Sequence, residues 1–168
     1  MTTTGNLTTA SDDHHVSGEL SLLPDELQVG SDRIRFHVTA AQTAGALVAA
    51  EVRMPPGGGP PVLHRHGPAE IYRVERGELA FYVEDDDAEV RRLTASPGSV
   101  VPIAGGRAHT IRNETGDEAL AYVVYAPGAP MEAFARAAAT LPAPPSMDAV
   151  LDLAQRHGIE MAGPVPEG

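Results

Sequence analysis

The chain has 168 residues, 42% of them hydrophobic, so it is long enough to bury the core of one ordinary domain and too short for two large ones. Its formal net charge of −11, with no basic stripe, argues against nucleic acid or an anionic membrane surface as a partner. The sequence has neither Cys nor Lys, which excludes disulfides, thiolate nucleophiles and ligands, and Schiff-base chemistry on a side-chain amine.

The first residues differ in composition from the rest of the chain. Residues 1–18 are rich in Thr, Ser and Asp and hold almost no large apolar residue, so we expect a mobile tail there. This start lacks the basic and apolar regions of a secretory signal, and no stretch approaches the roughly 18 apolar residues of a membrane helix. We therefore expect a cytoplasmic protein that does not enter a membrane.

Alternating apolar and polar residues begin at Ile34, which shares one face with Phe36 and Val38. On the opposite face, His37 is expected to be a surface partner of the neighbouring arginines. About eight further strands are predicted, separated by turns rich in Gly and Pro. They cover residues 46–54, 62–66, 70–74, 78–83, 90–93, 100–103, 109–113 and 120–125. This series of short strands predicts an all-β antiparallel sandwich or barrel.

After Pro127 and Gly128 the pattern becomes helical. Pro130 suits the first turn of a helix that runs to about Ala138, and Ser146 is a good N-cap for a second helix that ends at Gly158. The second helix has an apolar stripe that is expected to pack on the barrel, formed by Met147, Val150, Leu151 and Ala154. We therefore divide the chain into a tail (1–18), a barrel (19–128) and a C-terminal helical extension packed on the barrel (129–168).

Three histidines and one glutamate form the most informative group in the sequence. His64 and His66 are two residues apart on a predicted strand, so their imidazoles point to the same side. Glu70 begins the next strand after a turn and can return to that side, and His109 begins a later strand. Each residue alone has a simple structural explanation, but three imidazoles and a carboxylate together suit a borderline divalent ion.

The spacing of these residues resembles the two sequence motifs of the cupin superfamily. The first stretch consists of Gly58, His64, His66, Glu70 and Gly77, and the second of Gly98, Gly106, His109 and Asn113. The second departs from the family at Ala104, where Pro is usual. The resemblance covers roughly residues 20–164 and implies a cupin double-stranded β-helix, a jelly-roll barrel, that holds one divalent metal ion. It implies His64, His66, Glu70 and His109 as ligands, a turn-fixing role for Asn113, and a homodimer.

A narrower resemblance is to small single-domain quercetinase-like cupins. It rests on residues 32–43, 57–61 and 158–161, with Gly163 and Pro164. It implies a dioxygenase that uses O₂ on a small aromatic or enolic hydroxy compound, with Glu70 acting also as general base. Two alternatives stay open: a non-oxidative cyclase, isomerase or lyase, and a binding module with a structural metal. The metal, whether Fe, Ni, Mn, Co or Zn, stays open as well.

Strand alternation also suggests residues for a substrate pocket. Tyr72 and Val74 face the same way as Glu70, Ile111 faces the same way as His109, and Phe81 lies on the apolar face of its strand. Any of these can contact a substrate, although most such residues are simply core. Arg107, in the loop before His109, is expected at the surface.

Overall fold

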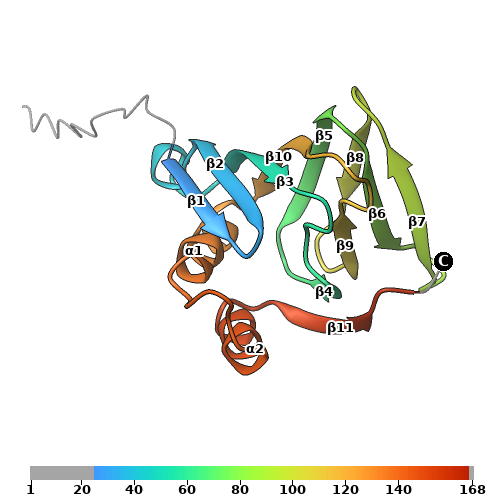
Figure 1. Cartoon of the computed structure of the whole chain (residues 1–168). Helices are drawn as coiled ribbons and strands as arrows, with labels where there is room; N and C mark the ends of the chain where they lie inside the picture. The colour runs from blue at the N-terminus through green and yellow to red at the C-terminus, as the bar shows by residue number, and fades with distance from the viewer. Residues whose placement is uncertain (1–24, 167–168) are drawn as a thin grey trace, which may run out of the picture.

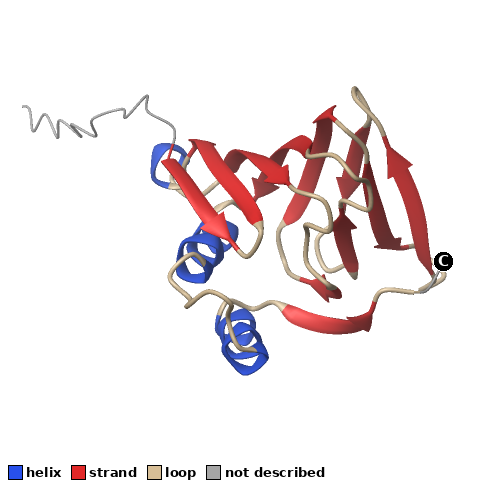
Figure 2. Cartoon of the chain, viewed as in Figure 1, coloured by secondary structure: helices blue, strands red, loops and turns tan. Residues whose placement is uncertain are grey.

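Two antiparallel sheets face each other and enclose the core, as the computed structural model of residues 25–166 shows (Figure 1). The first sheet has the strand order β1-β2-β3-β10-β5-β8, and the second has the order β11-β4-β9-β6-β7. The strands are β1 (Asp25–Val29), β2 (Asp32–Val38), β3 (Val48–Met54), β4 (Val62–Arg65), β5 (Ala69–Arg76), β6 (Leu79–Glu84), β7 (Val90–Ala95), β8 (Val100–Ile103), β9 (His109–Arg112), β10 (Ala119–Ala126) and β11 (Glu160–Pro164). The all-β jelly-roll prediction is confirmed, with helices α1 (Ala129–Ala138) and α2 (Met147–Arg156) after the main strands (Figure 2).

Each strand predicted from alternation is present, but β1 and β11 were not predicted. β11 contains Gly163 and Pro164, which are depleted in strands, so only its pairing with β4 reveals it. The segment after residue 128 is therefore not purely helical, because its last part joins the second sheet (Figure 1). The predicted tail at residues 1–18 lies outside the described residues. No helix within residues 25–166 is long and apolar enough to cross a membrane.

The two helices begin and end close to where the sequence predicts. Ser146 caps α2, with its Oγ accepting a hydrogen bond from the Ala149 N–H at 3.3 Å. The predicted packing stripe is partly wrong, however, because Met147 is 60% exposed and Leu151 is 42% exposed. α2 packs on α1 and on β11, the edge strand of the second sheet, and it buries Leu153 and Ala154.

The core fills the space between the inner faces of the sheets. It includes fully buried residues from several strands, among them Val48, Val74, Leu79, Phe81 and Val123. Burial of a side chain of this size contributes about 1.5–3 kcal/mol each. A second, smaller cluster lies on the outer face of the second sheet, where Ala162 and Val165 of the C-terminal segment cover Leu63, Ala80 and Tyr82.

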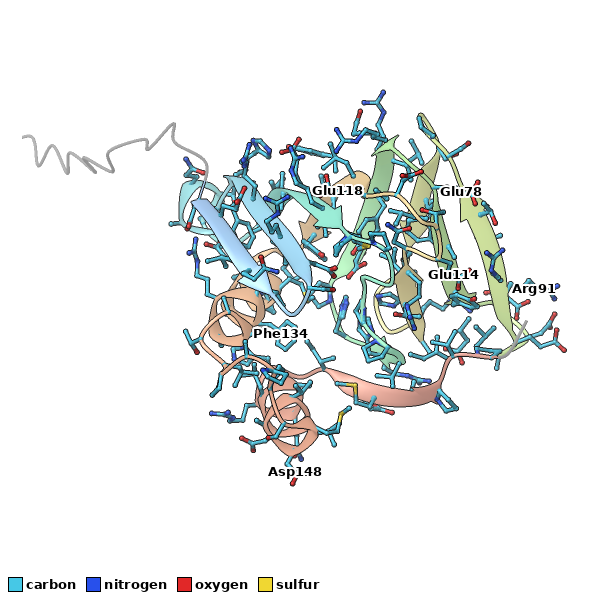
Figure 3. All side chains as sticks on the ribbon, in the orientation of Figure 1. Glu78, Arg91, Glu114, Glu118, Phe134 and Asp148 are labelled. Atoms are coloured by element: carbon cyan, nitrogen blue, oxygen red, sulfur yellow. The ribbon has the colours of Figure 1, made fainter. Side chains whose placement is uncertain are left out.

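Charged residues cover the outer face of the first sheet. His37 is exposed there, but its partner is Glu51, at 3.4 Å, and not the arginines that were predicted. Arg33 instead lies 3.3 Å from Glu118, a residue labelled in Figure 3, and Arg35 pairs with Glu26. Each of the three basic residues thus pairs with a glutamate on a different segment, and not with another basic residue.

The loop before β4 is held against β9 by close backbone contacts. Gly59 has φ +97°, and a Cβ there would lie 2.0 Å from the Ile111 carbonyl oxygen, so no other residue fits. The Asp32 carboxylate accepts hydrogen bonds from the Gly59 N–H at 3.1 and 3.2 Å. These contacts fix the approach of the chain to the strand that carries His64.

Candidate metal centre

The three histidines of the cupin-like motifs come together inside the barrel. His64 on β4 lies directly opposite His109 on β9, and His66 follows β4 by one residue. The ring centroids of His64 and His109 are 4.6 Å apart, and those of His66 and His109 are 5.0 Å apart. One nitrogen from each ring lies within 4.8 Å of the other two, so the three residues form a possible metal site.

Backbone carbonyls determine which ring nitrogen faces the centre. His109 Nδ1 lies 2.8 Å from the Arg107 carbonyl oxygen, and His66 Nδ1 lies 3.1 Å from the Pro68 carbonyl oxygen. His64 Nδ1 lies 3.4 Å from the Val62 carbonyl oxygen. Because a carbonyl oxygen only accepts, each Nδ1 carries the proton and each Nε2 presents a lone pair to the centre. This is the arrangement in which histidine binds a metal ion.

Glu70 on β5 completes the group from the other sheet. Its Oε1 lies 2.8 Å from His66 Nε2, its Oε2 lies 3.5 Å from His109 Nε2, and all three side chains are 2% exposed. His66 Nε2, His109 Nε2 and Glu70 Oε2 are buried without a hydrogen-bond partner. Buried acceptors that face one another in this way are costly unless a cation lies between them.

A divalent ion fits this arrangement. Ligands that are neighbours around an ion with bonds of about 2.1 Å lie about 3.0–3.4 Å apart. The two distances from Glu70 to His66 and His109, 2.8 and 3.5 Å, are close to this range, and the histidine nitrogens lie within 4.8 Å of one another. Three imidazoles and one carboxylate suit Mn, Fe, Co, Ni or Zn. The turn that places His109 forms without the usual Pro, because the Arg107 N–H donates to the Ala104 carbonyl and the Gly106 N–H donates to the His66 carbonyl.

A family comparison agrees with this geometry. The family model described as a cupin domain matches residues 50–125, which contain His64, His66, Glu70 and His109. Residues 50–125 therefore form a cupin domain. No curated protein shows significant similarity to it.

Solved structures extend the comparison at the level of the fold. Oxalate decarboxylase from Bacillus subtilis at pH 4.6 matches with 19% identity and a TM-score of 0.53, over 61% of this chain and 27% of that one. A structure of the same enzyme from work on its Mn(II) centres matches with the same values. The protein TT1209 from Thermus thermophilus matches with 26% identity and a TM-score of 0.44, over 50% of this chain and 75% of that one.

The protonation states in this cupin are compatible with metal binding. Burial and the neighbouring His109 lower the pKa of His64 to about 4, so His64 is neutral at physiological pH. Burial by itself would raise the pKa of Glu70, but the adjacent imidazoles of His109 and His66 outweigh it and lower that pKa to about 2. Glu70 is therefore a carboxylate, and its charge raises the pKa of His109 despite the burial of that imidazole. A proton and a metal ion would compete for the same position.

A cavity of about 130 Å³ adjoins the candidate centre. His64, Glu70 and His109 line one part of it, and the hydroxyl-bearing side chains Tyr72 and Tyr125 lie beside them. The remaining wall is mainly aliphatic and aromatic and includes Met131 and Phe134 of α1. Phe134 lies on the side of α1 that faces the barrel (Figure 3). A largely apolar chamber with a few polar groups is the usual form of a small-molecule site.

The predicted pocket residues divide into two pairs. Tyr72 and Ile111 line the cavity, whereas Val74 and Phe81 are fully buried in the core and do not reach it. The Phe81 ring packs edge-on against the ring of Tyr72, with centroids 5.5 Å apart, and so supports the wall from behind. Alternation predicts the face of a strand on which a residue lies, but not its position along the barrel.

Other lining residues were not predicted. Tyr125 belongs to a predicted strand and lies opposite Glu70 in the sheet, a register that alternation alone does not reveal. Met131 and Phe134 lie on a helix whose contact with the cavity depends on tertiary packing. Arg107 is bound to Asp86 and to the Asp85 carbonyl in the acidic turn after β6, and it does not line the cavity.

Proposed function

We propose that this cupin is a metal-dependent enzyme, a dioxygenase that acts on a small aromatic or enolic hydroxy compound. The observation that carries the proposal is that the candidate ligands adjoin a cavity with mainly apolar walls. His64, Glu70 and His109 all line this cavity. An ion with a purely structural role is normally enclosed by its ligands, whereas a catalytic ion keeps a side open to substrate.

The candidate ligands define what a bound metal ion would contribute. His64, His66, Glu70 and His109 would hold one divalent ion, and Mn, Fe, Co or Ni would keep positions free beyond these four ligands. When bound, such an ion lowers the pKa of a hydroxyl group that coordinates to it. The carbonyl contacts of the histidine Nδ1 atoms keep the rings oriented for this role.

Glu70 is the general base in this proposal. It is an anionic carboxylate at physiological pH and lies at the cavity wall, where it can accept the hydroxyl proton of a bound substrate. Removal of that proton leaves an electron-rich enolate, the form of the substrate that reacts with O₂. The apolar wall excludes water and protects this enolate from reprotonation.

A test of the proposal begins with protein purified without chelators. Its metal content is measured, and an oxygen electrode then screens catechols, enolones and flavonols for O₂ consumption. We expect stoichiometric metal and a product that carries oxygen from ¹⁸O₂. Turnover without incorporated label would contradict the dioxygenase and favour a non-oxidative cyclase, isomerase or lyase, which can use the same proton abstraction. Bound metal without turnover would favour a binding module.

A further inference from the structure

The two tyrosines of the cavity form a hydroxyl pair beside Glu70. Tyr72 follows Glu70 by two residues on β5, and Tyr125 lies opposite Glu70 on β10, so both face the cavity. Their hydroxyl oxygens are 3.1 Å apart. The Glu70 carboxylate is the other polar group close to the Tyr72 hydroxyl. The pair is therefore a polar unit in an otherwise apolar wall.

Counting protons shows that the pair has one donor to spare. Each tyrosine has one O–H group, and the bond between them uses only one of the two. A phenol is protonated at neutral pH, so both tyrosines keep their O–H groups. The remaining O–H points either to Glu70 or into the cavity, where a ligand oxygen can accept it.

The size of the cavity limits the ligand. An engineered cavity of about 150 Å³ in another protein holds a benzene molecule. The cavity here, of about 130 Å³, is of that order, so it suits one six-membered ring. A fused flavonol with a third, pendant ring exceeds it unless α1 moves.

The charges around the cavity limit the ligand further. Its lining holds the carboxylates of Glu70 and Asp32, and no arginine from the described residues contributes to it. The Asp32 carboxylate accepts hydrogen bonds from the Gly59 N–H, so its role is to hold the loop before β4. A ligand with two carboxylates could place only one of them on the metal ion. The other would face apolar walls and negative charge, with no basic side chain to pair with, which is costly.

We infer that the substrate is a neutral single-ring compound with two adjacent oxygens, such as a catechol or a cyclic enolone. One oxygen faces Glu70 and the neighbouring oxygen accepts a hydrogen bond from the Tyr72–Tyr125 pair. This inference rests on the proposed function and narrows its substrate class. It excludes dicarboxylates such as oxalate, and it excludes flavonols.

Binding, rather than turnover, is the direct test. Protein loaded with redox-inert Zn²⁺ is titrated calorimetrically with 4-methylcatechol, a flavonol and oxalate. We expect 4-methylcatechol to bind most tightly, and Tyr125→Phe to weaken it about tenfold, the effect of one lost hydrogen bond. Tyr122→Phe is the matched control, because Tyr122 lies on the same strand but on the face near His37, and it should bind like wild type.

Two outcomes would overturn the inference. One is tighter binding of the flavonol or oxalate than of 4-methylcatechol, and the other is equal binding by the Tyr125→Phe and Tyr122→Phe proteins. Tyr72→Phe provides a second variant if Tyr125→Phe does not fold, as judged by circular dichroism. Failure of the proposed function is distinguishable, because the catechol would then bind in a Tyr125-dependent manner while protein loaded with a redox-active metal turns over no substrate.

Discussion

The two ends of the barrel interior are built differently. At one end, Val74, Leu79 and Ala119 are fully buried in an apolar cluster. At the other end, His66, Glu70 and His109 are just as deeply buried, yet their inward atoms lack partners. Both ends lie on the same strands, since β5 carries Glu70 near its start and Val74 four residues later.

The difference shows where this fold is optimised for stability and where it is not. Buried polar atoms are almost always paired in native proteins, and exceptions concentrate at functional sites. The packed end follows the rule, and even its buried Asn113 is fully bonded, with its Nδ2 donating to the Met54 and Asp117 carbonyls. The unpaired atoms at the other end are therefore placed where a bound cation would satisfy them.

The largest effect is expected on catalysis, at the polar end of the barrel, which is the end that holds His66, Glu70 and His109. Glu70→Gln removes the proposed base while it keeps the shape of the side chain, so turnover should fall by about 10²–10⁴-fold. Steady-state kinetics on the substrate found in the oxygen-electrode screen measure this loss, with metal content determined in parallel. If the variant retains metal and consumes O₂ as fast as wild type, Glu70 is not the base.

At the packed end, the expected effect is on stability instead. Phe81→Ala removes a fully buried ring and should lower the free energy of unfolding by about 3–5 kcal/mol. Urea denaturation followed by circular dichroism measures the change. A loss below about 1 kcal/mol would show that this end is not the tightly packed core described here.

Metal addition should stabilise the wild-type protein through the polar end. At a free metal concentration of about 100 times its Kd, the gain is about 2.7 kcal/mol in the free energy of unfolding. His64→Ala should lose most of this gain, whereas His37→Ala, a change of an exposed histidine on the outer face, should keep it. Equal stabilisation of both variants would place the bound metal elsewhere.

The smallest predicted effect concerns Asn113, the buried polar side chain at the packed end whose hydrogen bonds are all made. Asn113→Ala leaves the Met54 carbonyl and the Thr115 N–H without their partner and should cost about 1–3 kcal/mol. The variant should bind metal as wild type does, because the side-chain hydrogen bonds of Asn113 go to Met54, Asp117 and Thr115 and not to the candidate ligands. A selective loss of metal without loss of stability would contradict the separation of the two ends.

Much of this structure follows from local sequence patterns, and the remainder depends on tertiary contacts. Alternation predicted the strands that carry Glu70 and His109, and the motif spacing predicted that they meet. Alternation did not predict β11, because Gly163 disfavours a strand and only the pairing with β4 stabilises one there. Nor did alternation distinguish Tyr72 at the cavity from Val74 in the core, because both residues lie on one strand face and differ only in their position along the barrel.

Anomalous diffraction from crystals of protein purified without chelators tests the metal centre most directly. We predict a single strong peak about 2.0–2.3 Å from the Nε2 atoms of His64, His66 and His109 and from a Glu70 carboxylate oxygen. A metal-replete crystal with no peak among these four side chains, or with the four groups too far apart to share an ion, would contradict it.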